Sequence, residues 1–113
     1  MKYIRTEDGI YEDAGTDALG LRCVRYKGNK IALSQDDDKI VKEADTIEEL
    51  CDMFVVVDNE RHIPLSNVED TNEEWLKRVF HVSNNYVVYG AIWTEKGLIY
   101  VAKMNDKGEL EVL

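Results

Sequence analysis

The sequence has few of the residues that mark linkers, export signals or membrane spans. Its 113 residues include 1 proline, Pro64, and no stretch rich in serine and glycine that would separate two domains. No apolar run approaches the roughly 20 residues that a helix needs to cross a bilayer. The amino-terminal residues carry charges throughout and lack the apolar core of a signal peptide. We therefore expect a cytoplasmic protein that folds as a single domain over residues 1–113 and makes no contact with membranes.

Cysteine is also scarce. The 2 cysteines, Cys23 and Cys51, have none of the spacings that bind metals or catalyse thiol exchange. In a reducing compartment the default is a pair of free, buried thiols, although the sequence alone does not exclude a disulfide. Acidic residues surround Cys51 in the chain and disfavour the thiolate that a nucleophile needs. Both cysteines are therefore expected to pack in the core.

The residues of common metal and catalytic sites are equally sparse. His62 and His81 are the 2 histidines, and neither belongs to an H-x-x-x-H pair. The acidic run QDDDK (Gln35–Lys39) lacks the spacing of a calcium loop and is expected to be a solvated turn. The glycine motifs of phosphate-binding loops and nucleophile elbows do not occur. The sequence therefore predicts no catalytic residue, cofactor or metal ligand, and an enzyme built from scattered carboxylates remains an alternative.

Acidic residues, in contrast, are abundant and unevenly placed. The net charge is −9, and residues 43–74 hold 11 acidic residues and 1 basic residue. Phosphate neutralisation needs lysine and arginine clustered on one face, so direct binding to nucleic acid is not expected. The basic cluster of Arg22, Arg25, Lys27 and Lys30 is expected to line the exposed face and turn of a hairpin.

Alternating apolar and polar residues predict strands over much of the chain. Tyr3–Tyr11 is expected to form two short strands joined by a glycine turn. Further strands are expected at Leu21–Tyr26, Lys30–Ser34, Lys39–Lys42 and Val55–Val57. The clearest block is C-terminal, where an antiparallel three-stranded meander is expected from Tyr86–Thr94, Leu98–Met104 and Glu109–Val112.

The middle strand of this meander has apolar residues on both sides. Strict alternation would place Leu98, Tyr100, Ala102 and Met104 on one face and Ile99, Val101 and Lys103 on the other. Such a strand is expected to be central and covered on both faces. If only two short helices cover the sheet, part of it stays open as an apolar contact surface. The candidate residues for that surface are Tyr89, Trp93, Ile99 and Val101.

Two acidic segments predict the helices. DTIEELCDMF (Asp45–Phe54) and DTNEEW (Asp70–Trp75) both open with residues that cap helices and favour the positive end of the helix dipole. Apolar residues then recur at helical spacing, first in Ile47, Leu50, Cys51 and Phe54, and then in Trp75, Leu76, Val79 and Phe80. The carboxylates are thus explained without a ligand. The predicted fold class is α+β, an antiparallel sheet of hairpins and a C-terminal meander with two short helices packed on it.

Two segments carry a resemblance to known sequences. ADTIEELCDMFVV and GAIWTEKGLIYVAKMNDKGELEVL are similar to segments of short uncharacterised proteins of Gram-positive bacteria and their phages. Met53 stands where an acidic residue is usual in the first segment. The resemblance implies a prophage accessory gene with a small cytoplasmic product, and it implies no activity, ligand or catalytic residue.

These observations favour a non-catalytic accessory protein that binds another protein or associates with itself. One alternative is an acidic decoy of nucleic acid that occupies the basic groove of a host DNA-binding or defence enzyme. That alternative requires one acidic interaction face, for which the candidates are Glu48, Glu49, Asp52, Glu69, Asp70, Glu73 and Glu74.

Overall fold

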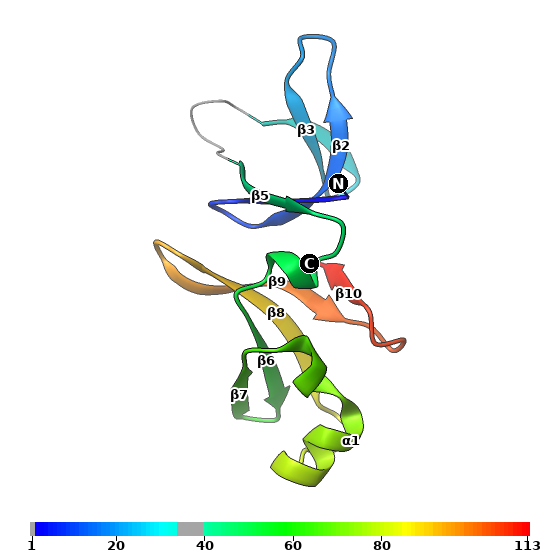
Figure 1. Cartoon of the computed structure of the whole chain (residues 1–113), viewed down its shortest axis with the longest axis vertical. Coiled ribbons are helices and arrows are strands. Elements are labelled where there is room, and N and C mark those ends of the chain that lie inside the picture. Colours follow the sequence, from blue (N-terminus) through cyan, green and yellow to red (C-terminus); the bar gives the residue numbers. More distant parts are fainter. Residues whose placement is uncertain (1, 34–39) are drawn as a thin grey trace. The chain divides into compact units, whose positions relative to one another are not determined.

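The structure is a computed structural model, and it describes residues 2–33 and 40–113 (Figure 1). In these residues, ten strands form two antiparallel sheets of five strands each, and the helical segments are short. The expected α+β class with antiparallel sheets is therefore confirmed. The chain divides between Leu50 and Cys51 into two compact units, each built on one sheet. The single domain over residues 1–113 stays a prediction.

The first unit contains the sheet with strand order β4-β3-β2-β1-β5. Ile4, Val24 and Leu33 form its buried cluster, and Tyr11 packs against them. The expected short strand pair in Tyr3–Tyr11 is confirmed, because β1 and β2 are antiparallel neighbours. The strands are β1 (Tyr3–Thr6), β2 (Ile10–Thr16), β3 (Arg22–Tyr26), β4 (Asn29–Ala32) and β5 (Ile40–Ala44).

The hairpin of β3 and β4 carries the basic cluster, as expected. Tyr26 pairs with Asn29, so Lys27 and Gly28 form a two-residue turn. Both turn residues have positive φ, 50° and 82°, which is the geometry that such hairpins favour. The side chain of Arg22 instead forms two hydrogen bonds with the carboxylate of Asp13, of 3.0 and 2.9 Å. Of the neighbouring predictions, the QDDDK turn and the ends of two strands at Ser34 and Lys39 lie outside the described residues.

The second unit contains the sheet with strand order β10-β9-β8-β6-β7. Between β7 and β8, a 3-10 turn η2 (Val68–Thr71) leads into the helix α1 (Glu73–Trp75), which continues as the wider turn η3 (Leu76–Phe80). The strands are β6 (Met53–Asp58), β7 (Arg61–Leu65), β8 (Val87–Thr94), β9 (Gly97–Met104) and β10 (Leu110–Val112).

The helix predicted for Asp45–Phe54 is wrong. Only the 3-10 turn η1 (Glu48–Leu50) forms, and the chain enters β6 at Met53. The run Val55–Val57 is β-branched, which favours a strand, and β6 lies between β7 and β8. Pairing on both sides of this run outweighs the helical spacing that precedes it.

The second predicted helix exists but begins later than expected. Its N-cap is Asn72, whose side-chain oxygen accepts hydrogen bonds from the backbone nitrogens of Glu74 (3.0 Å) and Trp75 (3.3 Å). The hydroxyl of Thr71, an expected cap, donates instead to the carbonyl oxygen of Val68. The expected capping role of Asp70 and Thr71 is therefore wrong.

The segment Arg61–Leu65, which is not among the strands expected from the sequence, is the edge strand β7. Proline is compatible with this place, because an edge strand has one side with no neighbour to accept a backbone hydrogen bond. Pro64 lies opposite Val55 in the pairing of β7 with β6. His62 is an exposed residue of this strand.

Candidate functional site

The strand register of the second unit separates the side chains of its sheet into two faces. Val56 pairs with Val88, and both pack with Leu76 of the helix in a buried cluster. Val55 pairs with Tyr89 and therefore points to the opposite face. In the described part of the second unit, the helix thus covers the face of Val56 and Val88 and leaves the face of Val55 and Tyr89 without a helix.

A bulge in β9 decides which of its residues belong to the face without a helix. Gly90 pairs with Ala102, but the next residue, Ala91, pairs with Tyr100, so the register of these two strands skips Val101. Leu98 and Tyr100 consequently share the face of Tyr89, while Ala102 lies on the other. The strict alternation expected over Leu98–Met104 is therefore wrong.

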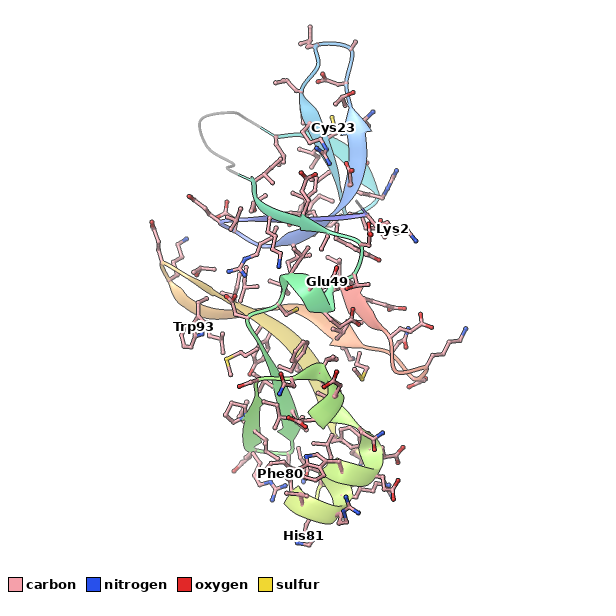
Figure 2. The ribbon with its side chains drawn as sticks, viewed as in Figure 1. Lys2, Cys23, Glu49, Phe80, His81 and Trp93 are labelled. Carbon is pink, nitrogen blue, oxygen red and sulfur yellow. The ribbon has the colours of Figure 1, made fainter. Side chains whose placement is uncertain are left out.

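The resulting surface, here called the aromatic face, is apolar, with Val55 and Ala91 buried and its aromatic residues Trp93 and Tyr100 exposed. The rings of Tyr89 and Tyr100 stack with centroids 4.8 Å apart and an interplanar angle of 12°. Trp93 is 60% exposed and Tyr100 is 38% exposed. Figure 2 shows Trp93 and Phe80, which belongs to the helical segment, at different ends of the second unit. The aromatic face comprises Met53, Val55, Tyr89, Ala91, Trp93, Leu98 and Tyr100.

The backbone of Trp93 is held firmly although its side chain is exposed. The carboxylate of Asp52 accepts a hydrogen bond of 2.8 Å from the Trp93 backbone nitrogen, and the Asp52 nitrogen donates to the carbonyl of Ala91. In the following turn, the hydroxyl of Thr94 donates to the carbonyl of Gly97, which has a φ of 104°. The indole is therefore presented from a fixed position.

The sequence identified part of this surface. Of the predicted contact residues, Tyr89 and Trp93 lie on the aromatic face. Ile99 pairs with Ile92 and points to the opposite face, and Val101 is buried with 6% exposure. Neither residue therefore belongs to the aromatic face, whereas Tyr100 does, and the contact surface itself stays a prediction. Tyr100 was missed because the bulge leaves no mark in the composition of the strand.

The candidate acidic residues are distributed over both units. Glu48 and Glu49 belong to the first unit, and the other five belong to the second. Within the second unit, Asp52 precedes β6, whereas Glu69, Asp70, Glu73 and Glu74 lie on η2 and α1. Leu76 of the helical segment packs with Val56 of β6, which lies roughly 13 Å along the strand from Asp52. The single acidic face stays a prediction.

The second unit also contains an open groove of about 750 Å³ beside the start of the helix. Val68, Tyr86 and Met104 are among the apolar residues that line it, and Glu73 is among the charged ones. Burial, assisted by the nearby Glu73, raises the pKa of Tyr86. The enzyme alternative calls for two or more strongly shifted groups in one pocket and stays a prediction.

In residues 2–33 and 40–113, no three residues among histidine, cysteine, aspartate and glutamate are grouped as they would be around a metal ion. No helix in these ranges has the length and apolar character needed to cross a membrane. Cys23 is a buried thiol, as expected, and Cys51 is half-buried.

The chain was also compared with known proteins. Family models, curated proteins and solved structures each give no match. The functional conclusion therefore depends on the surface of the protein itself, where the aromatic face exposes the large apolar side chains of Trp93 and Tyr100.

Proposed function

We propose that the protein is a small non-catalytic interaction protein that binds another protein, or a second copy of itself, through the aromatic face. The observation that carries the proposal is Trp93, which is 60% exposed on a backbone fixed by Asp52. Tryptophan and tyrosine are the residues that most often dominate binding energy at protein interfaces. A rigid strand that presents both is suited to contact with a partner.

Covering Trp93 would release a substantial free energy. An indole with this exposure leaves roughly 100–150 Å² in water, and its burial is worth about 3 kcal/mol at 25 cal/mol per Å². The stacked pair of Tyr89 and Tyr100 extends the apolar surface beside it. A partner that covers all three rings gains more than one that covers Trp93 alone.

The proposal includes the setting suggested by the sequence, a cytoplasmic accessory protein of prophage type. The second of the two segments that carry this resemblance begins at Gly90, so it includes Trp93, Leu98 and Tyr100. The proposal also takes the C-terminal strands as a three-stranded meander that serves as the platform, with short helices packed on its other side. Its partner is a protein, and neither nucleic acid nor membrane is bound directly.

Photo-crosslinking in cells that naturally produce the protein tests this proposal. A benzophenone amino acid replaces Leu98, which lies on the aromatic face beside Trp93 and leaves all three rings in place. The matched control carries the same group at Val79, which is 41% exposed on the helical segment. We expect a discrete protein adduct from position 98 and none from position 79. Equal labelling at the two positions, or no adduct at either, would contradict the proposal.

A further inference from the structure

The aromatic face has charges of opposite sign at its two ends. At one end Lys103 pairs with Tyr89 across β8 and β9, and at the other end Asp52 binds the backbone of Trp93. Tyr89 and Trp93 are separated by roughly 13 Å along the strand. Between these ends lie Ala91 and Tyr100, which carry no charge. The two ends of the face thus carry opposite charges, and its centre is apolar.

We infer that the occupant of the aromatic face is a second copy of the chain, an inference that rests on the proposed function. A symmetric dimer needs a surface that is complementary to itself. A twofold axis between the two faces, perpendicular to the strands, exchanges their ends. It brings the Lys103 end of one copy to the Asp52 end of the other and places Trp93 over the partner's Tyr89. An axis parallel to the strands would instead oppose equal charges.

The size of the face indicates a weak dimer. Three neighbouring strands with the length of β8 cover roughly 15 by 25 Å, or about 400 Å². Stable interfaces bury about 800 Å² on each partner. Each copy also carries a net charge of −9, so two copies repel each other until salt screens the charge. The dimer is therefore expected at micromolar or higher concentrations, and it strengthens with ionic strength.

Sedimentation equilibrium of the purified full chain tests the inference, over roughly 5–500 μM at low and at high salt. We expect the average mass to rise toward that of a dimer. Trp93→Ser should weaken association by about 30-fold or more, the usual loss for a dominant interface tryptophan. Trp75→Ser, at the exposed Trp75 of the helix, is the matched control and should leave association unchanged.

Lys103→Glu tests the orientation of the two copies. In the inferred dimer the new glutamate meets the acidic end of the partner, so association should weaken by about 3- to 10-fold. With the axis parallel to the strands, one pair of like charges replaces another, so association is unchanged at high salt, which screens the added net charge. An unaffected Lys103→Glu variant therefore overturns the inferred orientation.

The failure of this inference is distinguishable from failure of the proposed function. A chain that stays monomeric throughout, or a dimer that Trp93→Ser does not weaken, overturns the second copy as occupant. The proposed function survives either result if position 98 crosslinks to a different protein in cells. An adduct with twice the mass of the chain supports both.

Discussion

At the scale of single residues, Gly90 leaves room for the side chain of Cys51 in the second sheet. A Cβ added to Gly90 would lie 2.6 Å from the Cys51 Sγ and 3.4 Å from the Ala102 Cβ. Gly90 therefore provides the space that the half-buried thiol fills, and the role of Cys51 at this contact is packing. The expectation that Cys51 packs as a small apolar residue agrees with this contact.

Gly90→Ala is expected to lower the free energy of unfolding by about 1–3 kcal/mol, because it overpacks this contact. Urea denaturation measures the change. The double variant Gly90→Ala/Cys51→Ala removes the sulfur that the new methyl group would meet. Its free energy of unfolding should therefore be close to that of Cys51→Ala alone. If Gly90→Ala were as stable as the parent chain, the prediction would be wrong, because the sheet would then accommodate the added methyl group without loss.

A second residue-scale feature is Asp58, whose buried carboxylate accepts hydrogen bonds from the Ser83 hydroxyl (2.5 Å) and backbone nitrogen (3.0 Å). The hydrogen bond from the Ser83 hydroxyl, and to a smaller extent the one from its backbone N–H, hold the pKa of Asp58 below the ordinary 3.8. The charged form is thus favoured by folding. The stabilisation is fully present above the ordinary pKa of aspartate and is lost as the pH falls through the lowered pKa.

Ser83→Ala should therefore reduce stability near neutral pH and make the decline of stability between about pH 5 and pH 3 shallower. Urea denaturation at several pH values gives both quantities. Ser66→Ala, at an exposed serine between β7 and η2, is the control and should preserve the parent profile. A Ser83→Ala profile parallel to that of the parent would contradict this role of the hydroxyl.

At the scale of elements, the start of the helix depends on Asn72 and not on the two residues before it. Replacing an N-cap asparagine by alanine costs about 1 kcal/mol. Asn72→Ala should lower the free energy of unfolding by about this amount, as measured in urea. Asp70→Ala, at the residue that the sequence pattern favours, should change it by less than about 0.5 kcal/mol. A larger loss of stability for Asp70→Ala than for Asn72→Ala would contradict this assignment and support Asp70 as the cap.

The hairpins could be predicted from the sequence because their signals are local. Gly28 and Gly97 supply turns with positive φ, and alternating residues on both sides define the strands. The helix expected at Asp45–Phe54 could not be corrected in the same way. Its spacing is helical, and only the pairing of β6 with two neighbours reveals that Phe54 belongs to a strand. Tertiary pairing overrides local propensity here.

The candidate site was predictable only in part, for a related reason. Tyr89 and Trp93 are four residues apart in one strand, so strict alternation predicts that they lie on the same face. The partners on β9 depend on the register, which shifts at Val101. A bulge inserts one residue and reverses the facing of everything beyond it. Tyr100 can therefore be assigned to the aromatic face only from the pairing of β9 with β8.

At the scale of the whole molecule, the aromatic face stands out against an acidic surface. The chain carries −9, yet the members of this face include no acidic or basic residue, and Lys103 and Asp52 place charge only at its two ends. Net charge keeps such a protein apart from its copies at low ionic strength, whereas the uncharged face offers a place where contact is favourable. Association that strengthens with salt follows from these two properties together.

Fluorescence of Trp93 tests the central claim most directly, that the aromatic face is open in the isolated chain and covered by a protein contact. In the variant Trp75→Phe, Trp93 is the single remaining tryptophan. In dilute solution we expect red-shifted emission that acrylamide quenches readily, and on concentration at high salt a blue shift with protection from acrylamide. Blue-shifted, protected emission already in dilute solution would contradict the account, because the indole would then be buried within its own chain.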